Sequence, residues 1–345
     1  MPSTTNRFIV AVAGAGKTRE IVELALSDPD RRVLIVTYTN ENRSLIAKRV
    51  IERAGSTPAN IELTTWYSFL LNDCARPYQR ALTGDVGAIR GIDFQAERNQ
   101  YVKSTNTRKY FFDSRYNMYR DGVSDFVCKL DAAADGAVIR RLEHIYDLIL
   151  IDEMQDLVGY DLEVLHLLMK STLSLVAVGD PRQHTLSTNR SPKNKKYRGA
   201  GMVDWFAEQS AICDVEHRVQ NYRCNEQICR FADALFPHLP KSESMVTEVT
   251  GHDGVVYVAE SEVVDYVDRY HPVALRYSRA FDTAGLPAIN IRIAKGSTFD
   301  RVLIFPTGPM REYLTHLDPS KLKSPELLYV ATTRARFSVA FVVPD

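Results

Sequence analysis

The chain has 345 residues, a formal net charge of zero and 45% hydrophobic residues, which suits about two domains of ordinary size in a soluble globular protein. A neutral net charge excludes a broadly basic nucleic-acid coat, so any contact with nucleic acid must be local. The five cysteines form no C-x-x-C pair, which argues against a zinc knuckle or a disulfide scaffold and indicates reduced thiols.

The first predicted strand follows the residues MPSTTNR at once, which leaves no room for a signal peptide. No apolar run approaches the ~20 residues that are needed to span a bilayer. We therefore expect a cytoplasmic protein without membrane contact.

Residues 8–26, FIVAVAGAGKTREIVELAL, predict a strand, a glycine-rich turn and then a helix. The backbone N–H groups of such a turn can wrap a β-phosphate, and the helix that starts there adds its dipole. Lys17 can neutralise the β- and γ-phosphate oxygens, and the Thr18 hydroxyl can reach Mg²⁺. The stretch therefore predicts a nucleoside triphosphate site. Its phosphate-binding residues are Ala13, Gly14, Ala15, Gly16, Lys17 and Thr18.

Short apolar runs alternate with helical patterns along the chain, which is typical of parallel α/β folds. Strands are predicted at 8–13, 33–37, 61–65, 147–152 and 175–179, and a second set at 215–219, 255–259, 273–277, 289–294, 302–305 and 339–343. The polar and basic segment 187–199 has no hydrophobic period, so it predicts a loop near the domain boundary. We predict a first domain over 1–208, with a mostly helical insertion at about 72–142, and a second domain over 209–345.

The stretch LILIDEMQD places two acids at the end of a buried strand. Asp152 can hold Mg²⁺ through water, and Glu153 can orient or deprotonate the attacking water. Paired acids at a strand end also serve to cap a following helix, which is the alternative interpretation. Together with the phosphate-binding turn, and followed by Gln155, the pair predicts a nucleoside triphosphate hydrolase.

A series of elements in a fixed order resembles those of the UvrD/Rep/PcrA-type superfamily 1 helicases. The elements are VLIVTYTNENRSLIAKRV, TTWYSF, IDEMQDL, VAVGDPRQ, QNYRCNEQI, IRIAKGSTFDRVLIF and ELLYVATTRAR. The resemblance implies two RecA-like P-loop NTPase motor domains with parallel sheets, ATP and Mg²⁺ as cofactors, and 3′–5′ movement on single-stranded DNA. It also implies that ATP draws the two motor domains together and that hydrolysis releases them.

The same resemblance assigns roles to residues near the nucleotide. Gln183 would sense the γ-phosphate or the attacking water, and Tyr222 would stack on adenine. Arg223 would reach the γ-phosphate, and Arg334 would be the arginine finger that stabilises charge on the transferred phosphoryl group. For Arg334 the alternative is a surface arginine on a helix. Further nucleotide contacts are expected at Arg19, Gly296 and Thr298.

Nucleic acid would be held by aromatic stacking and by charge along its backbone. The segment KKYRGA resembles the family's WRGA element, with tyrosine in place of tryptophan, and the basic residues around it form a predicted basic stripe. The alternatives are a solvated loop for that stripe and a core aromatic for Trp66. The stripe contains Arg190, Lys193, Lys195 and Lys196, and the candidate contacts are Tyr38, Thr39, Asn40, Thr65, Trp66, Tyr67, Lys195, Lys196, Tyr197, Arg198 and Arg292.

The sequence departs from the family pattern in four respects. No glutamine that reads adenine precedes the first strand, and Thr298 replaces the glutamate that holds the ribose. An inserted loop, HTLSTNRSPKNKKYRGA, follows Gln183. The stretch between Arg223 and the KGSTF element is too short for the large insertion called 2B, and the insertion called 1B is reduced to about 72–142.

Two functions of different classes fit these observations. The first is an ATP-dependent helicase or translocase on single-stranded DNA, with RNA as the other possible strand. The second is an ATPase subunit that senses DNA or a nucleotide and regulates a protein partner, such as a nuclease in repair or anti-phage defence. A P-loop kinase or GTPase does not account for the NYR, KGSTF and TTRA elements in that order.

Overall fold

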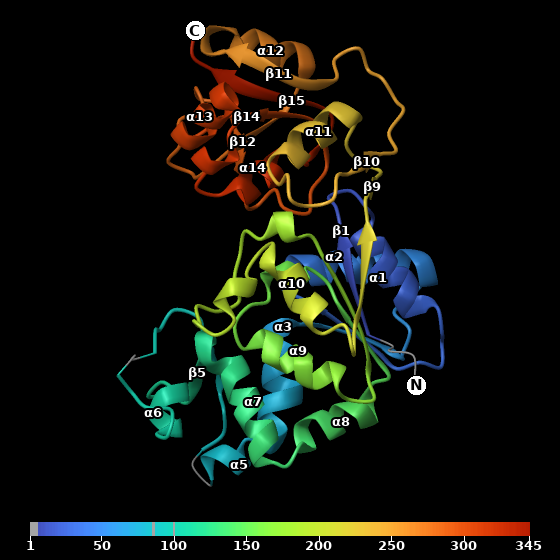
Figure 1. The fold of residues 1–345 in the computed structure, drawn as a ribbon, viewed down its shortest axis with the longest axis vertical. Helices are drawn as coiled ribbons and strands as arrows, with labels where there is room; N and C mark the ends of the chain where they lie inside the picture. The colour runs from blue at the N-terminus through green and yellow to red at the C-terminus, as the bar shows by residue number, and fades with distance from the viewer. Residues whose placement is uncertain (1–5, 85–86, 99–100) are drawn as a thin grey trace. The chain divides into compact units, whose positions relative to one another are not determined.

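The computed structural model describes residues 6–84, 87–98 and 101–345. These residues form two compact units, drawn in Figure 1. Unit 1 takes the chain up to Val10, then Lys17–Pro181 and Leu186–Glu216. Unit 2 consists of Ala11–Gly16, Arg182–Thr185 and His217–Asp345.

The sheet of unit 1 has six strands in the order β3-β2-β6-β7-β1-β8. Its strands are β1 (Arg7–Ala11), β2 (Val33–Thr37), β3 (Ile61–Thr65), β6 (Leu148–Ile151), β7 (Ser174–Gly179) and β8 (Asp214–Arg218). The pairs β1–β7, β2–β3, β2–β6 and β6–β7 are all parallel. Strand β2 is buried along its whole length, as expected for a parallel sheet that is covered on both faces. The predicted class of parallel α/β fold is confirmed.

Helices cover the sheet of unit 1 on both sides. Those outside the insertion are α1 (Lys17–Leu26), α2 (Asn40–Ala54), α3 (Trp66–Phe69), the π-helix η1 (Leu70–Ala75), α9 (Asp161–Met169) and α10 (Gly201–Glu208), with short 3₁₀ turns η3 (Met154–Asp156), η4 (Pro181–Gln183) and η5 (Lys195–Tyr197). Helix α2 illustrates how the sequence sets their ends. The Thr39 hydroxyl accepts from the Asn42 N–H (3.2 Å) at its start, and Gly55 closes it at φ 79°.

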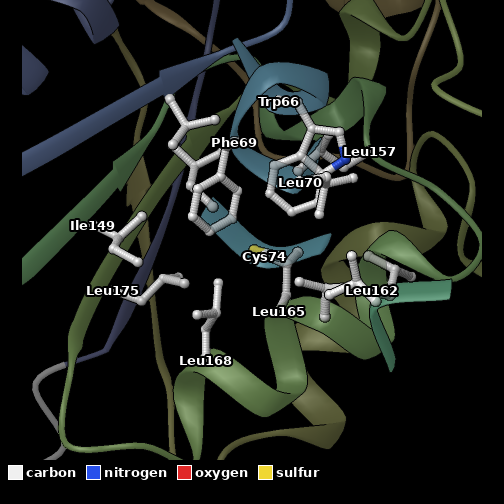
Figure 2. Close-up of a cluster of buried hydrophobic side chains, with 14 of the residues drawn as sticks. Trp66, Phe69, Leu70, Cys74, Ile149, Leu157, Leu162, Leu165, Leu168 and Leu175 are labelled. Carbon is white, nitrogen blue, oxygen red and sulfur yellow. The ribbon is translucent and has the colours of Figure 1, made fainter. Parts of the chain in front are cut away.

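One hydrophobic core joins α3 and η1 to the sheet and to α9. Figure 2 shows Phe69 beside Ile149 and Leu175 of the sheet, with the leucines of α9 close to Cys74. Burying this set of large apolar side chains is the main source of stability for unit 1. The core also fixes where the residues that follow β3 lie.

The predicted insertion folds as part of unit 1. It contains α4 (Arg76–Tyr78), α5 (Arg80–Thr83), α6 (Thr107–Phe111), η2 (Arg120–Gly122), α7 (Val123–Ala133) and α8 (Ala137–Ile145). Phe111 and Phe112 pack edge-on against Phe126, with ring centroids 5.2 Å and 5.5 Å apart, and all three belong to the core of unit 1. A parallel pair of short strands, β4 (Gly91–Asp93) and β5 (Asn117–Tyr119), was not predicted, because three residues are too few to show a period of two.

Asp161 is a buried carboxylate that ties several segments of unit 1 together. It is 1% exposed and opens α9. Burial raises the pKa of this carboxyl, and the hydrogen bonds that it accepts act in the opposite direction. Its donors are the Trp66 Nε1–H (2.9 Å), the Val158 N–H (3.1 Å), the Asn189 Nδ2–H (3.1 Å) and the hydroxyls of Ser124 and Thr188.

Unit 2 contains a parallel sheet in the order β11-β15-β14-β12-β13. Its strands are β11 (Gly254–Ala259), β12 (Val273–Arg276), β13 (Ala288–Asn290), β14 (Phe299–Ile304) and β15 (Ala335–Val343), and a separate pair joins β9 (Gln220–Asn221) to β10 (Glu243–Ser244). The helices are α11 (Glu226–Ala234), α12 (Val263–Tyr270), α13 (Gly308–His316) and α14 (Pro325–Thr332), with 3₁₀ turns η6 (Glu260–Glu262) and η7 (Pro319–Lys321).

Alternate residues of β15 face opposite layers of unit 2, as strand geometry requires. Val339 and Phe341 share a core with α11, α13 and α14, whereas Ala340 and Val342 share a second core with α12. Helix α12 contacts β11, and α14 contacts β14 and β15, an arrangement that can be followed in orange and red in Figure 1. The unit is therefore a sheet between two helical layers.

Two predicted strands differ from the structure. The strand predicted at 215–219 is β8, an edge strand of the sheet of unit 1 rather than part of the second set. The run predicted at 289–294 forms a strand only as far as Asn290, because the N–H groups of Ile293 and Ala294 then turn back to the Asn290 carbonyl (2.9 Å and 3.1 Å). Ile293 is 66% exposed. The alternating apolar residues that predicted a strand therefore extend beyond Asn290, where the strand ends.

Across the described ranges, no helix combines the length and apolar character that a membrane crossing requires. Within the same part of the chain, no cluster of three or more His, Cys, Asp or Glu residues suited to a metal ion is found. All five cysteines are free thiols.

Candidate functional site

The phosphate loop, residues 11–16, joins β1 to α1. Gly14 and Gly16 adopt φ angles of 75° and 85°, a left-handed conformation that glycine reaches without strain. A Cβ added at Gly14 would also lie 2.3 Å from the Asn221 Oδ1 and 2.8 Å from the Arg223 Cβ. The loop therefore has the glycine-dependent backbone bend before a helix that suits phosphate oxygens.

Backbone hydrogen bonds within unit 2 tie the phosphate loop to the segment that precedes the NYR element. The Val12 N–H donates to the Arg218 carbonyl (3.0 Å), and the Tyr222 N–H donates to the Gly14 carbonyl (3.1 Å). Tyr222 is 57% exposed. The structure thus places the residue predicted to stack on adenine directly beside the loop predicted to bind phosphates.

Arg334, the predicted arginine finger, is 1% exposed at the end of α14. Its Nε–H donates to the Val330 carbonyl (3.0 Å), and its Nη1–H donates to the Ser297 carbonyl (3.3 Å). Its Nη2–H donates to the Oε1 of Gln183 (3.3 Å). The alternative of a surface arginine does not apply, since two residues assigned to the γ-phosphate meet in a buried contact.

The other predicted residues of unit 2 either contact the segment next to Arg334 or are exposed. The Arg223 Nη1–H donates to the carbonyl of Thr333 (3.1 Å), the neighbour of Arg334. Gly296 adopts φ 90°, and Gly296 and Thr298 are exposed. Arg292, a predicted nucleic-acid contact, is also exposed.

The acidic pair lies at the end of β6 in unit 1. Asp152 is 5% exposed and accepts from the backbone N–H of Glu153 (3.0 Å). Glu153 is half-buried at φ 56°, a strained left-handed conformation that often marks functional residues. Its carboxylate accepts from the Gln155 Nε2–H, while the Gln155 Oε1 accepts from the Asp180 N–H (3.0 Å).

The helix-capping alternative for the two acids is not supported. Glu153 precedes η3 but makes no side-chain capping bond there, within the described residues. The next longer helix, α9, begins at Asp161.

Lys17 and Thr18 open α1 and are half-buried, whereas Arg19 is exposed. The Arg19 guanidinium pairs with Glu23 one turn later (Nε to Oε1, 3.7 Å). It lies on an open hollow of about 350 Å³ that is also lined by Val22, Arg49, Glu52 and Arg53. The Arg19 side chain, which was predicted to help read adenine, thus lies along α1 toward Glu23.

The predicted nucleic-acid contacts that follow β2 and β3 lie together. Because β2 and β3 are parallel neighbours, with Thr37 opposite Thr65, the segments after both strands emerge at the same edge of the sheet. There they form an open groove of about 480 Å³. Its lining comprises the predicted residues Tyr38, Thr39, Asn40, Thr65 and Tyr67, and also Glu41, Ser68, Leu71, Ile92 and Phe94.

Three aromatic residues predicted to contact nucleic acid are buried. Tyr67 is 8% exposed but still lines the groove, whereas the other two do not. Trp66 is 1% exposed, packs against Phe69 (5.8 Å between centroids; Figure 2) and donates to Asp161. Tyr197 is 8% exposed and donates its hydroxyl to Glu208. Neither ring offers a face to a base in this structure, so stacking by Trp66 and Tyr197 is corrected to a core role.

Ion pairs neutralise most of the predicted basic stripe. Lys193 pairs with Glu163 (3.4 Å), and Lys196 pairs with Glu208 (3.5 Å). Lys195 is exposed and forms no ion pair with any described residue. The stripe therefore presents less positive charge than its sequence predicts. The loop also contains two arginines. Arg190 pairs with Glu97, and Arg198 donates to the Ser191 carbonyl (2.8 Å).

Comparisons with known proteins identify the domain family and similar folds. The sequence matches the family model of the viral superfamily 1 RNA helicase core domain over residues 103–343 and that of an AAA domain over residues 2–188. The fold is similar to that of arterivirus nonstructural protein 10, a helicase, in two solved structures, one of which is a complex with DNA. Each comparison has a TM-score of 0.50 and 14% identity.

The chain spans only part of these solved relatives. The similarity covers 99% of this chain, but 60% and 61% of the two arterivirus chains. No curated protein matches the sequence.

Proposed function

The chain belongs to the superfamily 1 helicases, and from this premise we propose that it is an ATP-dependent translocase on single-stranded DNA. Its core is that of a helicase-like, nucleic-acid-dependent NTPase. The finer assignment, a UvrD-like motor that moves 3′ to 5′, is supported by the order of the sequence elements from the phosphate loop to the TTRA box.

The hydrogen bond between Arg334 and Gln183 is the observation that supports this proposal most directly. A buried guanidinium has a high desolvation penalty and stays buried only with good partners. Its partners here are residues of the VGDxxQ-like and KGSTF elements, which share no local structure. An arginine so held is positioned to stabilise negative charge on a transferred phosphoryl group.

The roles of the other residues follow from their chemistry. The phosphate loop and Lys17 hold the phosphates, and Arg223 adds positive charge. Thr18 offers a hydroxyl and Asp152 a buried carboxylate, two hard oxygen ligands that fit Mg²⁺. The metal, when bound, neutralises charge on the β- and γ-phosphates. Glu153 orients the attacking water and accepts its proton.

We expect single-stranded DNA to stimulate ATP hydrolysis and its affinity to fall steeply with salt. Lys195→Ala should reduce the slope of log K against log salt by about 0.7, because one phosphate contact of a single strand is lost. Lys170→Ala, which removes an exposed lysine at the end of α9, is the matched control and should leave the slope unchanged. Titrations of fluorescent oligonucleotides at several salt concentrations measure both slopes.

An ATPase rate that responds to no single-stranded DNA or RNA would overturn the translocase proposal. It would favour a subunit that regulates a protein partner. Stimulation by RNA alone would change the substrate while preserving the motor. Lys195 would be excluded as a phosphate contact if its variant kept the wild-type slope.

We expect ATP to be preferred over GTP only modestly, by about tenfold or less, and dATP to be accepted well. Tyr222 is half-exposed and can stack on any base, and Arg19 is paired with Glu23. Thr298 offers no carboxylate to the ribose hydroxyls. Steady-state hydrolysis of ATP, dATP, GTP and CTP on single-stranded DNA measures this preference, and strict use of ATP alone would show that another group reads adenine.

A further inference from the structure

Phe94 is an exposed aromatic residue that the family-like elements do not include. It follows β4 of the insertion and lies on the groove formed by the segments after β2 and β3. Its ring meets Tyr67 edge-on, with centroids 5.1 Å apart and planes at 90°, and Tyr67 lies 6.2 Å from Tyr38. We call these three rings the aromatic cluster. Phe94 is 54% exposed, while Tyr67 is 8% exposed.

We propose that Phe94 stacks on a base of the bound single strand and so takes the part that buried Trp66 cannot play. The proposal rests on the proposed function, because it assigns a further residue to the same nucleic-acid groove. Phe94 keeps more than half of its surface exposed beside Tyr67, and base–aromatic stacking uses an accessible ring face. Since Trp66 is in the core, Phe94 is the ring of this groove with the largest exposed fraction.

The backbone around Phe94 is held in place by contacts on both sides. The Asp93 Oδ1 accepts from the N–H groups of Gln95 (2.8 Å) and Ala96 (2.9 Å), which closes a turn around Phe94. Before that turn, β4 pairs with β5, and after it Glu97 pairs with Arg190 of the inserted loop. The ring is therefore presented on an ordered segment, which lowers the entropy lost on binding.

The groove suits bases rather than phosphates. Among the described residues that line it, Glu41 alone is charged, and it is acidic. The remaining polar groups are hydroxyls and the Asn40 amide, which can donate to and accept from the edge of a base. A phosphate site would require cations or a cluster of N–H donors. The occupant that fits an aromatic face beside uncharged polar groups is thus a base.

The experiment measures binding of oligo(dT) and oligo(rU) to the full chain. Phe94→Ala should weaken binding about tenfold at every salt concentration, because base–aromatic stacking is worth roughly 1–3 kcal/mol per base. The slope of log K against log salt should stay at its wild-type value, since no phosphate contact is removed. Phe94→Leu, which keeps an apolar side chain without a ring, should lose as much affinity as Phe94→Ala.

Phe94→Trp provides a readout that does not depend on activity. Its affinity should match the wild type, and its indole emission should be quenched by oligo(dT) but not by an oligomer of abasic sites. Tyr257→Ala is the matched control, because Tyr257 is 52% exposed on β11 and does not line the groove. Its affinity should be unchanged.

Wild-type affinity of Phe94→Ala or of Phe94→Leu would overturn the stacking role. A changed salt slope would do the same, since it would indicate a phosphate contact. Quenching of Phe94→Trp by an apolar peptide but by no oligonucleotide would assign the groove to a protein segment and also contradict the proposal. If the wild type itself binds neither oligonucleotide, the proposed function fails first, which distinguishes that failure from a failure of Phe94 alone.

Discussion

Glu153→Gln is expected to lower the rate of ATP hydrolysis by at least about 10²-fold while ATP still binds. Glutamine keeps the size of the side chain and can still accept from Gln155, as Glu153 does in the structure. It cannot take a proton from water, so the loss should appear in kcat rather than in nucleotide affinity. Single-turnover hydrolysis and binding of a fluorescent ATP analogue separate the two quantities.

Lys17→Ala is the contrasting variant for this experiment. Lys17 opens α1, and its charge is proposed to face the β- and γ-phosphates, so the variant should lose tight nucleotide binding as well as hydrolysis. If Glu153→Gln hydrolyses ATP at the wild-type rate, Glu153 is not the group that acts on water. A parallel loss of ATP binding in Glu153→Gln would point instead to a structural role at the end of β6.

Asp161→Ala is expected to destabilise unit 1 by about 3 kcal/mol or more. The substitution leaves the indole of Trp66, the Val158 N–H and other donors without their shared acceptor, and each unsatisfied buried donor costs about 1–3 kcal/mol. At roughly 2–4 °C per kcal/mol for a unit of this size, the melting temperature should fall by about 6 °C or more. Differential scanning calorimetry of the full chain measures the shift.

Asp30→Ala is the control for this experiment, because Asp30 is an exposed acid of the same unit. Such surface substitutions usually change stability by less than about 0.5 kcal/mol. Equal melting temperatures for Asp161→Ala and Asp30→Ala would show that the donors find other partners. The hydrogen bonds to Asp161 would then have little net worth.

The parts of the fold that could be predicted are those with a strong local signal. Strands β2 and β3 match their predicted bounds. Strand β2 is buried along its length and almost continuously apolar, whereas the edge strand β3 is only partly buried and ends in two β-branched threonines. Strand β8 is mostly polar, and its place at the edge of the sheet of unit 1 depends on long-range pairing. Strands β4 and β5 are too short to have a pattern, and they pair only because the insertion brings them together.

The site divides in the same way. The phosphate loop and the acids after β6 are local motifs, so composition and order identify them. The direction of a side chain at a strand–helix junction is not local, and Trp66 therefore turns into the core while its neighbour Tyr67 lines the groove. The acidic partners of the basic loop include Glu163 and Glu208, which lie in α9 and α10. How these helices pack against the loop could not be predicted from the sequence. Phe94 had no signal beyond being aromatic.

The hydrogen bonds of Asp161 also constrain how the chain folds as it is synthesised. Trp66 and Ser124 are made before Asp161, but Thr188 follows it by 27 residues. A nascent chain emerges from the ribosome in this order, and a domain folds once its parts are outside. Until the inserted loop has left the exit tunnel, the Asp161 carboxylate lacks the hydrogen bond from Thr188. Burying a carboxylate without all of its donors is less favourable. We therefore expect unit 1 to complete its folding only after the inserted loop has left the ribosome.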